Sequence, residues 1–83
     1  MTYPPHPGLK IKQYLADKNI SVKDAAKMLK IARPNFNNVL NGKSGISPVL
    51  AIKLEYAFGF NAYSLAIDQA FYDLEKEYKK GAS

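Results

Sequence analysis

One short segment of the sequence is rich in side chains that can hydrogen-bond to DNA bases. Arg33, Asn35, Asn37 and Asn38 lie close together, and no acidic residue interrupts them. Asparagine amides can pair with the N6 and N7 atoms of adenine in the major groove, and arginine can pair with O6 and N7 of guanine. Asparagine is unfavourable inside a helix because its side chain competes for backbone hydrogen bonds. The segment therefore predicts contacts with DNA bases, with a merely polar, exposed helix as the alternative.

The sequence contains few residues of the types that catalyse reactions or bind metals. His6 is the only histidine and the chain has no cysteine, so a metal site would lack its usual ligands. The serines have no paired base, and Gly42-Lys43-Ser44 lacks the earlier glycine of a phosphate-binding P-loop. We therefore expect no enzymatic activity, no catalytic residues, no metal, no cofactor and no small-molecule substrate. His6 is expected to order the start of the chain.

Basic side chains are concentrated in the first two thirds of the chain. The 83 residues include 12 basic and 7 acidic side chains, for a net charge of +5. Residues 1–54 have nine basic against two acidic side chains, whereas residues 55–83 have three against five. A basic surface favours a polyanion such as nucleic acid as a partner. A chance distribution of solvated charges is the alternative explanation.

Length and composition indicate one small folded domain over residues 1–83. Hydrophobic residues make up 47% and charged residues 23%, which is typical of globular proteins. No apolar run approaches the roughly 18 residues that cross a bilayer, so a cytoplasmic protein with no membrane contact is expected. Because no disulfide can stabilise so small a core, self-association is also expected.

Apolar spacing predicts an all-α fold of five short helices. Pro4, Pro5 and Pro7 exclude a regular helix at the start, so an extended N-terminal arm is expected over residues 1–8. The helices are expected from Leu9 to about Asn19, for about nine residues after Ser21, from Pro34 to Asn41, from Pro48 to Phe58, and over residues 61–78. The side chains that face inward in the second and third of these are Val22, Ala25, Ala26, Leu29, Phe36, Val39 and Leu40.

Helix ends are marked by residues suited to capping. Ser21, Ser47 and Asn61 are expected N-caps, and Gly42 and Gly59 are expected to end the third and fourth helices. The second and third helices, with the short break between them, have the size of a helix-turn-helix over residues 21–41.

Aromatic residues are abundant near the C-terminus. Seven lie between residues 56 and 78, which is more than the core of two short helices can enclose. Tyr and Phe are enriched at protein interfaces, so some of these side chains are expected to contact a protein partner.

The residues from Ser21 to Ser47 resemble the helix-turn-helix of phage-repressor-like (Xre/Cro) regulators. A narrower resemblance, over residues 6–74, is to the HigA antitoxin family. It depends on His6-Pro7-Gly8, Arg33-Pro34, Leu40-Asn41-Gly42-Lys43, Gly45-Ile46-Ser47 and the segment from Gln69 to Tyr72-Asp73-Leu74.

The resemblance implies a dimeric repressor that binds a palindromic double-stranded DNA operator, with the third helix of each subunit in the major groove. By position, the base-contacting residues would be Arg33, Asn35 and Asn38, with Asn37 as a further candidate. The residues that would contact the DNA backbone are Asn41, Gly42 and Lys43 after the third helix and Lys23 and Lys27 on the second.

It also implies autoregulation of the operon and neutralisation of a HigB or RelE-like ribonuclease toxin. The helix over residues 61–78 would contact the partner subunit or the toxin. The alternatives are a phage- or plasmid-type Xre regulator without a toxin and, in a different class, a small helical protein-interaction adaptor.

The sequence departs from the family pattern at Lys30, Ala32 and Ser64-Leu65. Lys30 replaces the turn glycine, and a positive φ there would cost about 1 kcal/mol. Ala32 replaces the serine that caps the third helix. Pro34 disfavours a helical conformation at Arg33, so the third helix is expected to begin at Pro34 with Arg33 as its cap. Ser64-Leu65 replaces a Phe-Trp pair in the last helix.

Overall fold

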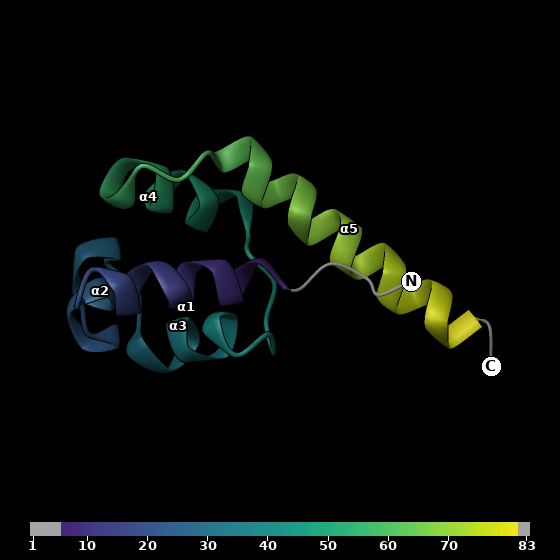
Figure 1. Cartoon of the computed structure of the whole chain (residues 1–83), viewed down its shortest axis with the longest axis horizontal. Coiled ribbons are helices and arrows are strands. Elements are labelled where there is room, and N and C mark those ends of the chain that lie inside the picture. The colour runs from purple at the N-terminus through teal and green to yellow at the C-terminus, as the bar shows by residue number, and fades with distance from the viewer. Residues whose placement is uncertain (1–5, 82–83) are drawn as a thin grey trace.

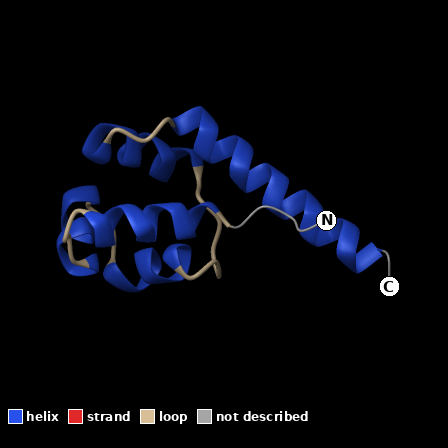
Figure 2. Ribbon diagram, in the orientation of Figure 1, coloured by secondary structure: helices blue, strands red, loops and turns tan. Residues whose placement is uncertain are grey.

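The computed structural model describes residues 6–81, which form five helices and no strand (Figures 1 and 2). The helices are α1 (Pro7–Asp17), α2 (Val22–Leu29), α3 (Arg33–Leu40), α4 (Pro48–Phe58) and α5 (Ala62–Gly81). The predicted all-α fold of five helices is confirmed, and α5 continues three residues beyond the expected end at Tyr78. No helix within residues 6–81 is both long and apolar enough to span a bilayer.

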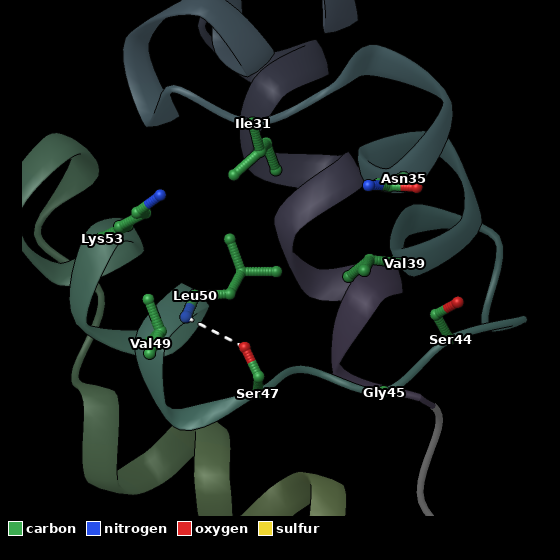
Figure 3. A pocket seen from close by; sticks show the side chains of 9 residues that line it. All are labelled: Ile31, Asn35, Val39, Ser44, Gly45, Ser47, Val49, Leu50 and Lys53. Atoms are coloured by element: carbon green, nitrogen blue, oxygen red, sulfur yellow. Dashed lines mark hydrogen bonds between the residues drawn. The ribbon is translucent and has the colours of Figure 1, made fainter.

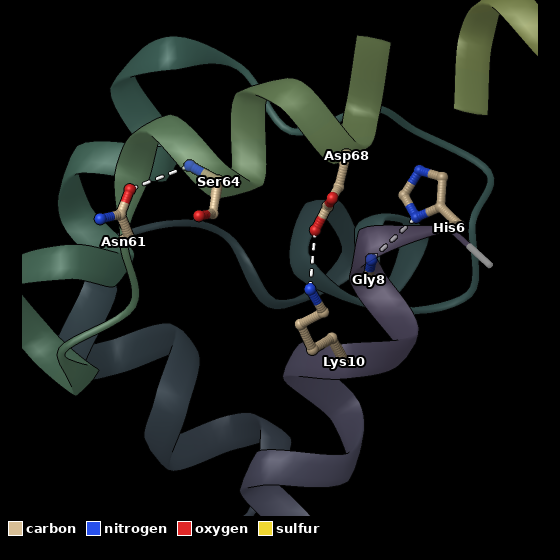
Figure 4. A network of polar contacts seen from close by, with 6 residues as sticks. All are labelled: His6, Gly8, Lys10, Asn61, Ser64 and Asp68. Carbon is tan, nitrogen blue, oxygen red and sulfur yellow. Dashed lines mark hydrogen bonds and ion pairs between the residues drawn. The ribbon is translucent and has the colours of Figure 1, made fainter. Parts of the chain in front are cut away.

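Side-chain caps begin three of the helices at the predicted residues. Ser21 Oγ accepts a hydrogen bond from the amide of Asp24, and Ser47 Oγ accepts one from Leu50. Asn61 Oδ1 accepts a hydrogen bond from Ser64 (Figure 4). These contacts satisfy amides that have no partner within the first helical turn.

The start of α1 differs from the prediction. Pro7 and Gly8 belong to the helix rather than to an extended arm, and residues 1–5 of the expected arm lie outside the described residues. His6 caps α1, because its Nδ1 accepts a hydrogen bond from the Gly8 amide at 2.9 Å. Proline suits the first helical position since the amide it lacks would have no helical partner. A Cβ on Gly8 would collide with the carbonyl oxygen of Val39, so glycine lets α1 and α3 approach closely.

The core lies where the first four helices meet, and α5 closes one end of it. Each helix, and Ile46 in the loop between α3 and α4, contributes apolar side chains that are almost fully buried. They are Ile11, Leu15, Ala25, Ala26, Leu29, Phe36, Val39, Leu40, Ile46, Leu50, Ala51, Leu54 and Leu65. Tyr14 packs beside them against the rings of Phe58 and Phe60. Leu9 belongs to the apolar pattern of α1 but is exposed. The C-terminal half of α5 projects beyond the other helices (Figure 1).

A continuous apolar surface covers α4 and α5 on the side away from the core. On α5 its members are spaced three or four residues apart and therefore share one face. The residues of this α4/α5 apolar surface are Ile52 and Tyr56 on α4 and Tyr63, Ile67, Phe71, Leu74 and Tyr78 on α5, all exposed. A groove of about 380 Å³, lined by Ile52, Tyr56 and Tyr63 among others, joins the two helices. Tyr56, Tyr63, Phe71 and Tyr78 are among the seven aromatic residues of which some are expected to contact a protein partner.

Candidate nucleic-acid interface

The turn between α2 and α3 is held by a lysine in a left-handed conformation. Lys30 has φ 57° and ψ 44°. It therefore adopts the left-handed conformation of the turn glycine that it replaces. The amides of Lys30 and Ile31 donate hydrogen bonds to Lys27 and Ala26 and close α2. Packing of the two helices therefore outweighs the conformational cost at Lys30.

The first residue of α3 is Arg33, which corrects the expected start at Pro34. Ala32 is the N-cap, with φ −67° and ψ 135°, and its side chain makes no capping hydrogen bond. The Ala32 carbonyl accepts a hydrogen bond from the amide of Phe36, a side chain that is fully buried. Arg33 precedes a proline and would by itself favour an extended conformation. The stabilisation from burying Phe36 exceeds that preference. Arg33 thus projects from the first turn of α3.

The outward face of α3 consists of polar side chains. Phe36, Val39 and Leu40 are buried and define the inner face. With 3.6 residues per turn, Asn38 lies near the centre of the opposite face, and Asn35 and Arg33 lie towards its two borders. All three are exposed, whereas Asn37 is half-buried. α3 lies at the edge of the molecule with α1 on its other side (Figure 1), so this face is open to a partner as large as DNA.

The backbone folds tightly after α3. The Asn38 carbonyl accepts hydrogen bonds from the amides of Lys43 and Ser44, at 2.8 and 3.2 Å. Gly42 has φ 77°, a conformation that glycine adopts without strain. Asn41 and Lys43 are exposed. The three residues predicted to contact phosphate are therefore brought next to the C-terminus of α3.

The positive charges in this region form no ion pair within residues 6–81. Lys23 and Lys27 are exposed and lie one turn apart on α2. The ion pairs found within residues 6–81 join Lys10 to Asp68 and Lys80 to Glu77. Neither pair includes Lys23, Lys27, Arg33 or Lys43, so these side chains can contact an external anion.

A pocket of about 280 Å³ opens beside the start of α3 (Figure 3). Its apolar lining includes Ile31, Val39 and Leu50, and its polar lining includes Asn35 and Lys53. Lys53, on α4, was not singled out from the sequence, because a single lysine among the apolar residues of α4 has no distinctive pattern. The pocket places this cation on the same side of the molecule as Asn35.

Several polar contacts tie α5 to the rest of the domain, among them a hydrogen bond from the Ala62 amide to Glu55 Oε1 on α4. Lys10 Nζ lies 2.7 Å from Asp68 Oδ2 and joins α1 to α5 (Figure 4). Gln69 Oε1 accepts a hydrogen bond from the amide of Ile46 at 3.0 Å, and Gln69 Nε2 donates one to Asp73. Sequence analysis assigned Gln69 to a family motif but did not identify this contact.

His6 is buried between α1 and α5. Its ring meets the ring of Tyr72 edge to face, with centroids 4.8 Å apart. Burial lowers the pKa of His6 below its usual value, and Lys76 acts in the same direction, while Asp73 and a backbone hydrogen bond at Ser44 oppose the shift. The described residues hold no cluster of three or more His, Cys, Asp or Glu side chains suited to a metal ion.

No family model matches this chain. Comparisons with known sequences and with solved structures did find similar proteins. It is 44% identical over 78 residues to virulence-associated protein A' of Dichelobacter nodosus, covering 92% of this chain and 67% of that protein. It thus spans about two thirds of that relative.

Two solved structures have the same fold. The first, an addiction module antidote protein of a HigA family from Coxiella burnetii, has a TM-score of 0.90 and 28% identity over 98% of this chain and 89% of that one. The second is the antitoxin HigA of Pseudomonas aeruginosa with the higBA promoter. It has a TM-score of 0.88 and 30% identity over 95% of this chain and 87% of that one.

Proposed function

Since the chain belongs to the HigA family of helix-turn-helix antitoxins, we propose that it is a sequence-specific repressor of its own operon and the antitoxin of a toxin–antitoxin module. The observation that supports DNA binding most directly is the outward face of α3, where arginine and asparagine side chains are exposed without a neighbouring acid. The promoter in the structure of the Pseudomonas relative supports the same proposal. Both solved relatives are described as antitoxins or antidote proteins rather than as enzymes.

Each part of the interface has a proposed role. Side chains on α3 pair with base edges in the major groove, and the loop after α3 and the lysines of α2 contact phosphates. The proposed base contacts are Arg33, Asn35, Asn37 and Asn38, and the proposed backbone contacts are Lys23, Lys27, Asn41, Gly42 and Lys43. Asn37 is half-buried and so presents less of its side chain to a partner than Asn38 does.

Two copies of the chain are proposed to bind a palindromic operator. A two-fold dimer would present two α3 helices to half-sites about one DNA turn, roughly 34 Å, apart. The α4/α5 apolar surface is the exposed region best suited to bury against a second copy or a HigB or RelE-like toxin, because contiguous apolar patches mark protein interfaces. Binding to an operator places the protein's action in the cytoplasm.

Titration of the purified protein against DNA from its own promoter tests the repressor proposal. A scrambled duplex of equal length is the control, and both are measured at about 50 and about 200 mM salt. We expect the promoter to bind at least about a thousandfold more tightly than the scrambled duplex. Equal, weak and salt-sensitive binding to both would contradict a specific repressor.

Co-purification tests the antitoxin role. We expect the product of an adjacent gene for a small basic protein to bind this chain and to lose its ribonuclease activity in the complex. Operator binding in the absence of an adjacent toxin gene would favour a transcriptional regulator that has no toxin partner. The absence of salt-dependent DNA binding would favour a protein-interaction adaptor.

A further inference from the structure

Two sequence motifs at opposite ends of the chain meet in space at one loop. The motif from His6 to Gly8 begins α1, and the motif from Gln69 to Leu74 lies on α5. Both contact residues 42–46, the loop that follows α3.

Gln69 holds the loop from the side of α5. Its side chain is only 8% exposed, and its Oε1 accepts the hydrogen bond from the Ile46 amide. The bond from Nε2 to Asp73 orients the amide group so that its oxygen faces the loop. A Cβ on Gly45 would lie 3.3 Å from the Gln69 amide, so the loop backbone and this side chain are in close contact.

His6 holds the same loop from the N-terminal side. A Cβ on Gly42 would lie 3.6 Å from the Cβ and Cγ atoms of His6, and the imidazole takes part in a hydrogen bond with the backbone of Ser44. The other side of the ring contacts Tyr72 on α5. The loop is therefore enclosed by α5 and by the start of α1.

We propose that Gln69 is a positioning residue for DNA binding: together with His6 it fastens residues 42–46 to α5 and so sets where Lys43 meets the DNA backbone. Gln69 itself lies inside the protein and touches no DNA. The inference rests on the proposed function, since it assigns Gln69 a role only if the loop contacts phosphate.

Gln69→Met is the first test, because methionine keeps the volume of the side chain and removes both hydrogen bonds. We expect affinity for operator and for scrambled DNA to fall together by about five- to tenfold, comparable to the loss of one phosphate contact. Gln13→Met is the matched control. It removes the same side chain from α1, where the hydrogen bond is to Asp17, and should change affinity less than about twofold.

A double-mutant cycle separates positioning from general loosening of the fold. In a Lys43→Ala background, Gln69→Met should weaken binding less than about twofold, because the group that it positions is gone. In an Asn38→Ala background it should keep its full effect. A full effect in both backgrounds would overturn the proposal, as would wild-type affinity in Gln69→Met alone.

Gly45→Ala perturbs the same contact from the loop and covers the case in which Gln69→Met does not fold. Its Cβ would lie 3.3 Å from the Gln69 amide and would push it a few tenths of an ångström away. We expect a loss of affinity in the same direction, with a melting temperature close to wild type. Unchanged DNA affinity in this variant would overturn the proposal. A wild-type protein that binds no DNA at all would instead overturn the proposed function, and this inference with it.

Discussion

The amide nitrogen of Lys43 lies 2.8 Å from the carbonyl oxygen of Asn38. This hydrogen bond connects the centre of the outward face of α3 to the exposed lysine of the following loop. A residue proposed to contact bases and a residue proposed to contact phosphate are therefore held at a fixed separation. Substitutions at these two positions should have different effects on DNA binding, although the residues are close in space.

Asn38→Ala should reduce the preference for operator DNA. Loss of a bidentate contact to a base costs about 1–3 kcal/mol against the operator and nothing against scrambled DNA, where the contact is not made. Fluorescence anisotropy with both duplexes measures the difference. Equal losses on the two duplexes would remove Asn38 from the set of base-contacting residues.

Lys43→Ala should weaken binding to every duplex. Neutralising one phosphate releases about one counterion, so the slope of log affinity against log salt should fall by about one. Lys80→Ala removes the same charge from the end of α5, where it pairs with Glu77, and should leave the slope unchanged. A slope that is unaffected by Lys43→Ala would place the phosphate contact elsewhere.

Lys30→Gly should stabilise the fold. Relief of the left-handed conformation at this exposed residue is worth about 1 kcal/mol, which corresponds to a rise in melting temperature of about 4–8 °C for a domain of this size. Asn19 has the same φ of 57°, but asparagine tolerates it better, so Asn19→Gly should raise the melting temperature less. Thermal unfolding by circular dichroism decides the order, and a larger gain at Asn19 would refute the explanation.

Stability should fall as the solution is acidified past neutrality. Burial lowers the pKa of His6 in the folded state below the unfolded value of 6.5, so the unfolded chain binds the proton more readily. The stability due to neutral His6 is complete above pH 6.5 and is lost as pH falls through the lower pKa of the folded state. Protonation also removes the Nδ1 acceptor that caps α1.

The melting temperature measured between about pH 8 and about pH 5 tests this dependence. His6→Asn keeps a capping oxygen but does not titrate in this range, so its melting temperature should vary much less with pH. Because the chain has no other histidine, an equal dependence in His6→Asn would refute the assignment.

Phe71→Asp should disrupt the proposed dimer. Phe71 is 55% exposed on the α4/α5 apolar surface, and a carboxylate there would have to lose its hydration in a contact between two copies. Sedimentation should give twice the 9.2 kDa chain mass for wild type and the single mass for the variant, which should also bind the operator less tightly. Leu9→Asp, at an exposed leucine on α1, is the control, and a dimeric Phe71→Asp protein would move the interface to another surface.

Local patterns predicted the elements of the fold better than the contacts between them. Ser21, Ser47 and Asn61 cap helices as expected because a cap depends only on residues three or four positions away. The hydrogen bond between Gln69 and Ile46 joins residues that are 23 positions apart. No local sequence pattern could therefore predict it. The start of α1 was missed because the prolines suggested an arm, whereas His6 and Pro7 supply a cap and a first helical residue. The exposed face of α3 was predictable from its periodicity, but its orientation towards DNA depends on packing.

The two faces of α5 belong to one rigid helix. On one face Gln69 bonds to the loop after α3 and Tyr72 contacts His6, whereas Phe71 and Leu74 on the other face are exposed. A protein that binds the exposed face and shifts α5 must also shift the loop, so its binding energy is coupled to that of DNA. Thermodynamic linkage makes the coupling reciprocal: the factor by which such a protein changes operator affinity equals the factor by which the operator changes affinity for that protein.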